Sequence, residues 1–173
     1  MKWFFMSLLL CVSAFGETHT IERSQNNKVS WTAIGSPGFL QIDGEGGYVE
    51  GTLKDEGGKV SGTFTCELTN FKTGMSTRDK HMKNDYLHVK KFPTAKLVLD
   101  PVETGRSFDF TGELTLHGVT KKVKGKGDLK KVGGTNVITA KMTLILTDYN
   151  IEIPSYLGVT VAKNVDLEVR LAY

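Results

Sequence analysis

Apolar and polar residues alternate along several segments of this 173-residue chain, and this period-two pattern constrains the fold more than any other feature. The pattern is clearest in residues 60–68, 108–116 and 165–171, where apolar residues, glycine or cysteine occupy every second position. Successive side chains of a β-strand point to opposite faces, so each segment is predicted to be a strand with one buried face. Weaker alternation predicts further strands over residues 28–34, 39–43, 48–54, 94–100, 119–130 and 136–146.

Glycines separate most of these segments and predict turns at Gly46–Gly47, Gly57–Gly58, Gly118 and Gly133–Gly134. Strands with one apolar face favour antiparallel pairing, and a sheet of this many short strands must hide its edges in a barrel or a sandwich. Residues 77–87 break the pattern, because they are polar, lack glycine and proline, and place apolar residues at helical spacing. We expect one short helix there, between two strands.

The first 16 residues have the composition of a cleaved leader. Lys2 supplies a positive charge, residues 3–12 form an apolar run, and Ala14 and Gly16 are small residues at the positions that a signal peptidase inspects. The apolar run is about half as long as the ~20 residues that span a bilayer. We therefore expect cleavage after Gly16 and a periplasmic or secreted mature protein made of one domain, residues 17–173.

Charge, cysteine content and motifs exclude several classes of function. The 22 Lys and Arg residues against 19 Asp and Glu residues give a net charge of +3, too small to indicate a nucleic-acid partner. Cys11 lies in the expected leader, so Cys66 would remain as a single thiol, most simply a small core residue. The common nucleophile, phosphate-loop and zinc motifs do not occur. The basic run over residues 121–126 is interpreted as a solvated strand face, with contact to phosphate or anionic lipid as the alternative.

Histidines are the remaining candidates for chemistry. His81 and His88 are seven residues apart, a spacing that would put both rings on one helix face and allow a metal site with Asp79 or Asp85 as third ligand. Two helical turns separate such rings by about 10 Å, which favours solvated histidines instead. His117 lies in an expected hairpin and would need a positioned partner to act as a base.

Periodicity alone does not show whether the interior of such a barrel is filled or hollow. About eight strands enclose an interior that is either filled by side chains or holds one elongated ligand. The large apolar residues that would face inward are therefore either core or cavity wall: Phe39, Phe64, Phe71, Phe92, Phe108, Phe110 and Met142.

Three ordered blocks of sequence resemble the signatures of the YceI-like polyisoprenoid-binding family. The blocks are residues 73–82, 112–121 and 154–159, supported by Tyr86–Leu87, Phe92–Pro93, Val161 and Val165. Residues 39–51 depart from the family pattern, because they are glycine-rich and lack the histidine-containing early strand often found there. The resemblance covers nearly the whole expected mature chain.

This resemblance implies an all-β fold, an extended antiparallel lipocalin-like barrel of about eight strands with one short helix, around an apolar tunnel. Members of the family are typically exported bacterial proteins that bind a long isoprenoid chain, such as a quinone or a polyprenyl lipid. Carried over residue by residue, the resemblance implies a polar mouth formed by Arg78, Asp79, His81 and His117. The tunnel wall implied by the same comparison comprises Phe64, Phe71, Met82, Phe92, Phe108, Phe110, Leu114, Met142, Leu144 and Tyr156.

We therefore expect a binding protein for a long-chain isoprenoid or a similar amphiphile, with no catalytic residue, no metal and no cofactor other than the bound lipid. Nucleic acid is not an expected partner, transient membrane contact is compatible with this function, and the oligomeric state, a dimer included, stays open. One alternative is a small outer-membrane β-barrel, because residues 165–171 alternate up to the terminal aromatic Tyr173. A second alternative is an enzyme that uses His81 or His117.

Overall fold

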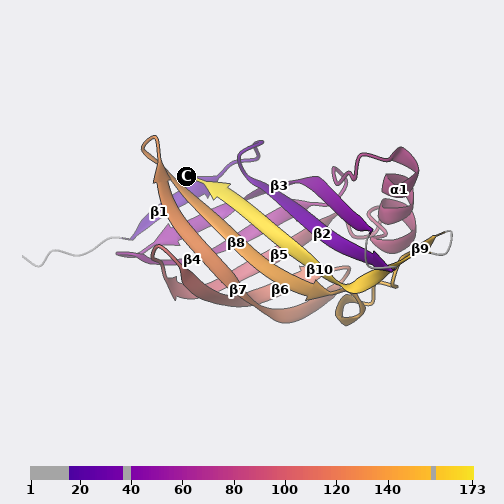
Figure 1. Cartoon of the computed structure of the whole chain (residues 1–173). Coiled ribbons are helices and arrows are strands. Elements are labelled where there is room, and N and C mark those ends of the chain that lie inside the picture. Colours follow the sequence, from indigo (N-terminus) through magenta and orange to yellow (C-terminus); the bar gives the residue numbers. More distant parts are fainter. Residues whose placement is uncertain (1–15, 37–39, 157–158) are drawn as a thin grey trace, which may run out of the picture.

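The chain forms a closed antiparallel β-barrel with a helical segment across one end (Figure 1). The computed structural model describes residues 16–36, 40–156 and 159–173, so the expected leader, apart from Gly16, lies outside the described residues, as does Phe39. The strands are β1 (Glu17–Ile21), β2 (Lys28–Ser36), β3 (Gln41–Asp55), β4 (Lys59–Glu67), β5 (Thr94–Glu103), β6 (Phe108–Leu116), β7 (Val119–Val132), β8 (Thr135–Ile145), β9 (Ser155–Tyr156) and β10 (Val159–Ala172).

Eight of these strands close the barrel in the order β3, β2, β10, β8, β7, β6, β5 and β4, and β4 pairs back with β3. Strand β3 can take both neighbours because it is long: its residues 41–48 pair with β2 and its residues 49–55 pair with β4. β1 pairs with residues 51–55 of β3 and so continues the line of β2. The expected all-β barrel of about eight strands with one short helix is confirmed.

The glycine pair Gly46–Gly47 does not form the predicted turn. Strand β3 runs through both residues, so the two strands predicted over 39–43 and 48–54 are one. Gly46 has a φ of +109°, and the register between β2 and β3 skips it, which makes it a β-bulge. Bulges and turns both favour glycine, so residue type alone could not separate them. The other three predicted turns do lie between strands, whereas neither β1 nor β9 is predicted by the alternation.

The expected helix lies close to its predicted position but has two parts. Helix α1 spans Ser76–His81 and continues as the π-helical turn η1, Met82–Tyr86. A short 3-10 turn, η2 (Leu146–Tyr149), follows β8 at the same end of the barrel (Figure 1). We call residues 68–93 the capping segment. Within residues 16–36, 40–156 and 159–173, no helix is both long enough and apolar enough to cross a membrane.

Backbone hydrogen bonds fix the start of the capping segment to the barrel and join the two ends of the segment to each other. Glu45 of β3 and Lys72 exchange two N–H···O bonds, each 2.9 Å long. The Leu68 N–H donates to the Pro93 carbonyl oxygen at 2.9 Å, which joins the first residue of the segment to its last. The segment is therefore anchored at its base before its helical turns cross the end of the barrel.

Large aromatic rings inside the barrel lie against glycines. Phe108 pairs with Gly127 and Phe110 with Gly125 across β6 and β7, and Trp31 pairs with Gly44 across β2 and β3. A Cβ atom at any of these three glycines would lie within 2.5 Å of the facing ring. Each ring thus lies over the glycine of the neighbouring strand, in the space that a side chain at that position would fill.

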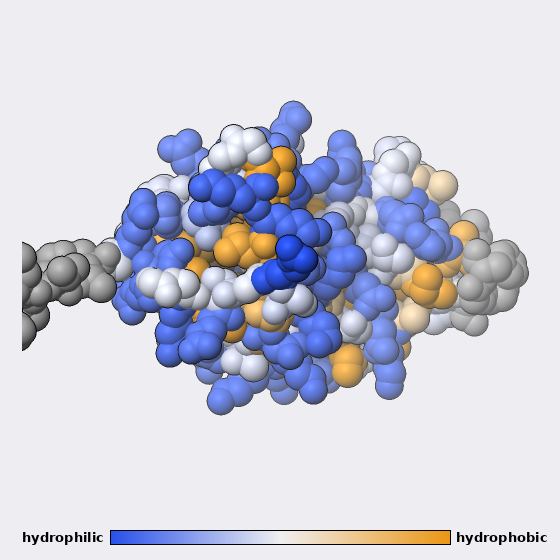
Figure 2. All heavy atoms as spheres, turned by 60° about the vertical axis from the view of Figure 1, so that its left-hand side comes forward, coloured by the Kyte–Doolittle hydropathy of each residue, from blue (hydrophilic) through white to orange (hydrophobic). Residues whose placement is uncertain are grey.

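The outward faces of the strands are mostly polar, as the blue surface in Figure 2 shows. In β6, for example, the exposed Asp109, Thr111 and Glu113 alternate with inward-facing Phe110 and Leu114. A barrel embedded in a bilayer has an apolar outer band and commonly a polar interior. The observed polarity is the reverse, which counts against the outer-membrane alternative.

Replacing Gly125 by valine tests the contact between ring and glycine. A Cβ atom there would lie 2.5 Å from the Phe110 ring and 2.3 Å from the Lys141 carbonyl oxygen. We expect Gly125→Val to lower the free energy of unfolding by about 1–3 kcal/mol, measured by urea denaturation, because the wall becomes overpacked. Lys124→Val, at the neighbouring exposed position, is the control and should change it by less than about 0.5 kcal/mol. Similar losses in both variants would contradict the assigned contact.

Candidate functional site

A cavity of about 890 Å³ lies inside the barrel and opens toward the capping segment. This volume is within the range of about 300–1,000 Å³ that is typical of small-molecule sites. At the opposite end the wall includes Leu53 and Val60, which are almost completely buried. The interior of this barrel is therefore cavity rather than a filled core, which answers the question that periodicity left open.

Eight of the ten residues expected in the tunnel wall line this cavity. They are Phe64, Phe71, Met82, Phe108, Phe110, Leu114, Met142 and Leu144. Phe92 does not, because its ring packs outside the cavity against His117, with ring centroids 4.6 Å apart, and beside Gly118. The side chain of Tyr156 lies outside the described part of the structure.

Further strands, β2 and β10 among them, supply wall residues that the sequence pattern was not used to assign to the tunnel. β2 contributes Val29, Trp31 and Ala33, and β10 contributes Val165, Leu167 and Val169. All six occupy alternate positions of predicted strands, so the period-two pattern contains the signal that places them on one face.

Polar side chains on the cavity wall gather at the end that the capping segment partly covers. Thr73, Thr77, Arg78 and His81 come from that segment, and Ser155 comes from β9. The rest of the wall is overwhelmingly apolar, with Val, Leu, Ile, Phe and Ala on the barrel strands. The cavity is therefore amphiphilic along its length, with its polar part at the mouth.

Arg78 and Asp79 both bind the turn at Thr73. The guanidinium of Arg78 donates from Nε to Thr73 Oγ1 and from Nη2 to the Thr73 carbonyl oxygen, each at 2.8 Å. Oδ1 of Asp79 accepts from the Thr73 N–H at 2.7 Å and from its hydroxyl at 2.5 Å. Arg78 also lines the cavity, whereas Asp79 is not among the lining residues. Of this pair, only Arg78 contributes to the cavity wall.

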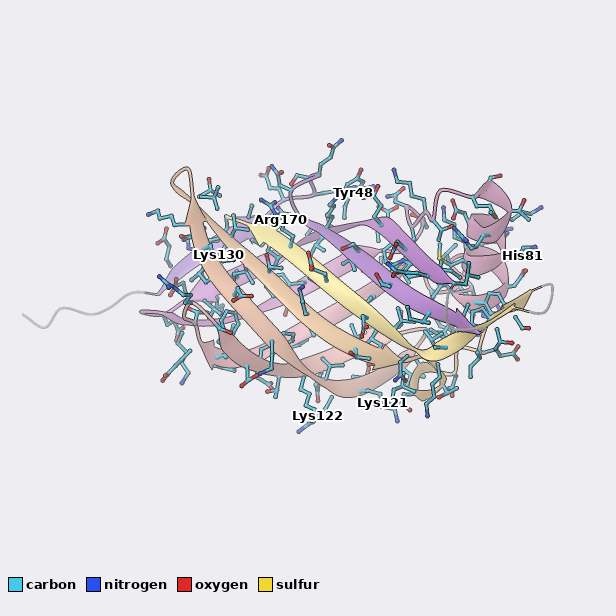
Figure 3. The ribbon with its side chains drawn as sticks, viewed as in Figure 1. Tyr48, His81, Lys121, Lys122, Lys130 and Arg170 are labelled. Atoms are coloured by element: carbon cyan, nitrogen blue, oxygen red, sulfur yellow. The ribbon has the colours of Figure 1, made fainter. Side chains whose placement is uncertain are left out.

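His81 lies at the helical end of the barrel (Figure 3). A carboxylate holds its ring. Its Nδ1 atom lies 2.6 Å from Oδ2 of Asp85, one helical turn further along. Next to this pair, Tyr86 reaches across the mouth: its hydroxyl lies 3.4 Å from the Ser155 carbonyl oxygen and 3.3 Å from the Ser155 nitrogen. A carboxylate beside an imidazole fixes the direction of the ring, and the ring faces the cavity mouth.

The structure places His117, expected at the polar mouth, outside the cavity wall. Its Nδ1 atom lies 3.0 Å from the Tyr149 carbonyl oxygen, which can only accept, so Nδ1 carries the proton. Nε2 of His117 lies 2.9 Å from Nδ1 of His88, within hydrogen-bond distance. His88 has a φ of +46° beyond the helical turns, so it shares no helix face with His81. Among the residues that the structure describes, no three His, Cys, Asp or Glu side chains lie close enough together to hold a metal ion.

The thiol of Cys66 belongs to the cavity wall, beside Phe71 and Gly47. Burial raises the pKa of this thiol from its ordinary value of 9.0 to about 12, with a smaller contribution from the Glu67 carboxylate. Reactive cysteines have a lowered pKa, so the raised pKa of Cys66 is that of a buried wall residue.

Comparison with known proteins identifies relatives over almost the full chain. Residues 20–173 match the YceI-like domain. A UPF0312 protein of Pseudomonas putida strain W619 is 32% identical over 177 residues, which cover 94% of this chain and 91% of the relative. A UPF0312 protein of Pseudomonas fluorescens strain SBW25 is 34% identical over 144 residues, 70% of this chain and 73% of the relative.

Solved structures share the fold at lower identity. BcnA of Burkholderia cenocepacia has a TM-score of 0.74 at 18% identity, over 88% of this chain and 99% of that protein. A polyisoprenoid-binding domain from Saccharophagus degradans, implicated in plant cell wall breakdown, has a TM-score of 0.67 at 12% identity, over 89% and 96%. Identities this low establish the shared barrel and nothing about the ligand of this chain.

A double-mutant cycle tests whether Arg78 and Thr73 act together. Thr73→Val removes the hydroxyl at nearly constant volume and should cost about 1–3 kcal/mol of unfolding free energy, because partners of that hydroxyl lose their hydrogen bonds. Arg78→Ala should also be destabilising, and the two losses should not add. Urea denaturation of the two single variants and the double variant measures the coupling. Additive losses would show that the pair is not coupled in solution.

The buried thiol predicts a specific pH dependence. Because the pKa of Cys66 is higher in the folded chain than the ordinary 9.0, its stabilising contribution is complete below pH 9 and is lost as the pH rises toward 12. Unfolding free energy of the natural chain should therefore fall more steeply between pH 9 and 11 than that of Cys66→Ala. Burial also raises the pKa of Tyr149 and Tyr173, but both tyrosines remain in the variant, so the difference in slope reports Cys66 alone. Parallel slopes would contradict a buried, neutral thiol.

Proposed function

The chain belongs to the YceI-like family, and from this membership and its amphiphilic cavity we propose that it is a periplasmic or secreted binding protein for a long-chain isoprenoid. A quinone or a polyprenyl lipid has the required shape, an extended apolar chain with one polar end. The observation that carries the proposal is the distribution of polarity along the cavity, apolar inside the barrel and polar at the capping segment.

The apolar wall would supply most of the affinity. Each buried CH₂ group contributes about 0.8 kcal/mol, so one five-carbon unit contributes about 4 kcal/mol before the cost of ordering the chain. The wall includes the rings of Phe64, Phe108 and Phe110 along the barrel, so several such units would be buried in succession. The aromatic rings would therefore contact the isoprenoid chain directly.

Arg78 and His81 would recognise the head group at the mouth. Nε and Nη2 of Arg78 are engaged by Thr73, which fixes the guanidinium and leaves Nη1 to donate to a phosphate or carbonyl oxygen. Asp85 similarly fixes the His81 ring at the rim. In this proposal both residues bind the head group and carry out no reaction, so the protein is a carrier or a store and not an enzyme.

Location in an exported compartment rests on the leader-like first 16 residues. In such an aqueous compartment a long isoprenoid is insoluble unless its chain is shielded. The closed barrel would provide this shield, because its outer face is polar and its inner face is apolar.

Lipid extracted from the purified protein and identified by mass spectrometry tests the proposal directly.

The variant Ala140→Phe tests where the isoprenoid chain lies. Ala140 lines the cavity, so a phenyl ring there would fill part of the interior. We expect Ala140→Phe to shift the preference toward shorter chains in a series of polyprenols. Lys141→Phe adds the same ring at the neighbouring exposed position and should bind like the natural chain. A protein that carries no isoprenoid and binds none of the polyprenols would refute the proposed function.

A further inference from the structure

The positive charge of the chain is concentrated in the capping segment. This segment contains six basic and two acidic residues, a net charge of +4, whereas the remainder contains 16 basic and 17 acidic residues. Both acidic side chains are already engaged, Asp79 by Thr73 and Asp85 by His81. Lys80 and Lys90 are exposed, and neither forms a salt bridge with any residue that the structure describes. The capping segment, which lies at the cavity mouth, is thus cationic, and of its basic residues Lys72 is paired with Glu45 at 3.4 Å.

Exposed apolar side chains gather at the same end. Met75, which is 55% exposed, immediately precedes α1 and also lines the cavity. Ile34 on the outer face of β2 lies opposite the β10 bulge between residues 161 and 165, and Ile145 of β8 pairs with Asn164 in that bulge. Ile153 directly precedes Pro154, another wall residue. Figure 2 shows orange surface at this end of the molecule, beside the grey segments.

We propose that this end of the barrel, formed by the capping segment with Ile34, Ile145 and Ile153, docks on a lipid bilayer that carries anionic head groups. Charge complementarity selects this partner, because lysines near a membrane surface are attracted to anionic lipids while neighbouring apolar side chains enter the interface. Met75 belongs both to the exposed surface and to the cavity wall, so an apolar path leads from the bilayer into the barrel. The inference rests on the proposed function, since it describes how a lipid would enter and leave the cavity.

Flotation with vesicles tests the docking surface. Vesicles of phosphatidylcholine alone are compared with vesicles that also contain phosphatidylglycerol, each at low and high salt. The natural chain should bind the anionic vesicles in preference, and high salt should weaken the binding because it screens the lysines. Lys80→Glu with Lys90→Glu should weaken binding at low salt by about tenfold or more.

Matched variants elsewhere on the barrel provide the controls. Lys124→Glu with Lys130→Glu makes the same change in net charge on the outer face of β7, and Figure 3 shows Lys130 at the end away from the capping segment. Met75→Asp should also weaken docking, whereas Val132→Asp, at a 60% exposed apolar residue beside the β7–β8 turn, should not. Equal losses in test and control variants, or no preference for anionic vesicles, would overturn the docking surface.

Binding of a polyprenol in solution without vesicles separates this inference from the proposed function. Variants of the docking surface outside the cavity wall, such as Lys80→Glu with Lys90→Glu, should keep the polyprenol affinity of the natural chain. Normal polyprenol binding together with no vesicle binding would overturn only the docking surface. Vesicle binding without polyprenol binding would refute the proposed function and with it the role assigned here to docking.

Discussion

The contact between an aromatic ring on one strand and a glycine on its neighbour is the constraint on which the open interior depends. An eight-stranded barrel is just wide enough for side chains to fill it, so a cavity requires that large residues stay near the wall. Phe108 over Gly127, Phe110 over Gly125 and Trp31 over Gly44 meet this requirement, because each ring occupies the space that a Cβ atom would take on the facing strand. These rings thus present a large apolar surface to the lumen without filling it.

The two ends of the barrel differ because β3 has two partners along its length. Its second half pairs with β4 and β1, and this end is closed by almost completely buried residues such as Ile21 and Leu53. Its first half pairs with β2, and there the backbone of Glu45 holds Lys72 at the start of the capping segment. Asn27, between β1 and β2, accepts a hydrogen bond from the Ala172 N–H and donates one to the Glu22 carbonyl oxygen. The same strand therefore closes one end and anchors the cover of the other.

Alternation predicts the walls of the barrel well, because inward and outward positions of a strand differ in polarity wherever one face is dry. It places Phe64, Phe110 and Met142 on the inward face, and the structure shows them on the cavity wall. It cannot separate core from cavity, because that distinction depends on which residue faces each ring across the next strand. Misplacements follow from tertiary contacts: Phe92 and His117 pack against each other, and the pairing of β3 with β2 skips Gly46, so the Gly46–Gly47 pair forms a bulge and not a turn. Neither feature can be predicted from the residues that neighbour it in the sequence.

The polar and apolar parts of the cavity depend on a ligand in different ways. At the mouth, Arg78 and Asp79 bind Thr73, and Tyr86 meets Ser155, so these groups have partners within the chain. Along the wall, by contrast, the apolar side chains that face the lumen gain contacts only when an apolar chain enters. A ligand that binds the folded state alone stabilises it in proportion to the logarithm of its concentration relative to Kd. The ligand would therefore stabilise the folded state mainly through contacts with the apolar side chains of the strands. The hydrogen bonds at the mouth would contribute to stability without a ligand.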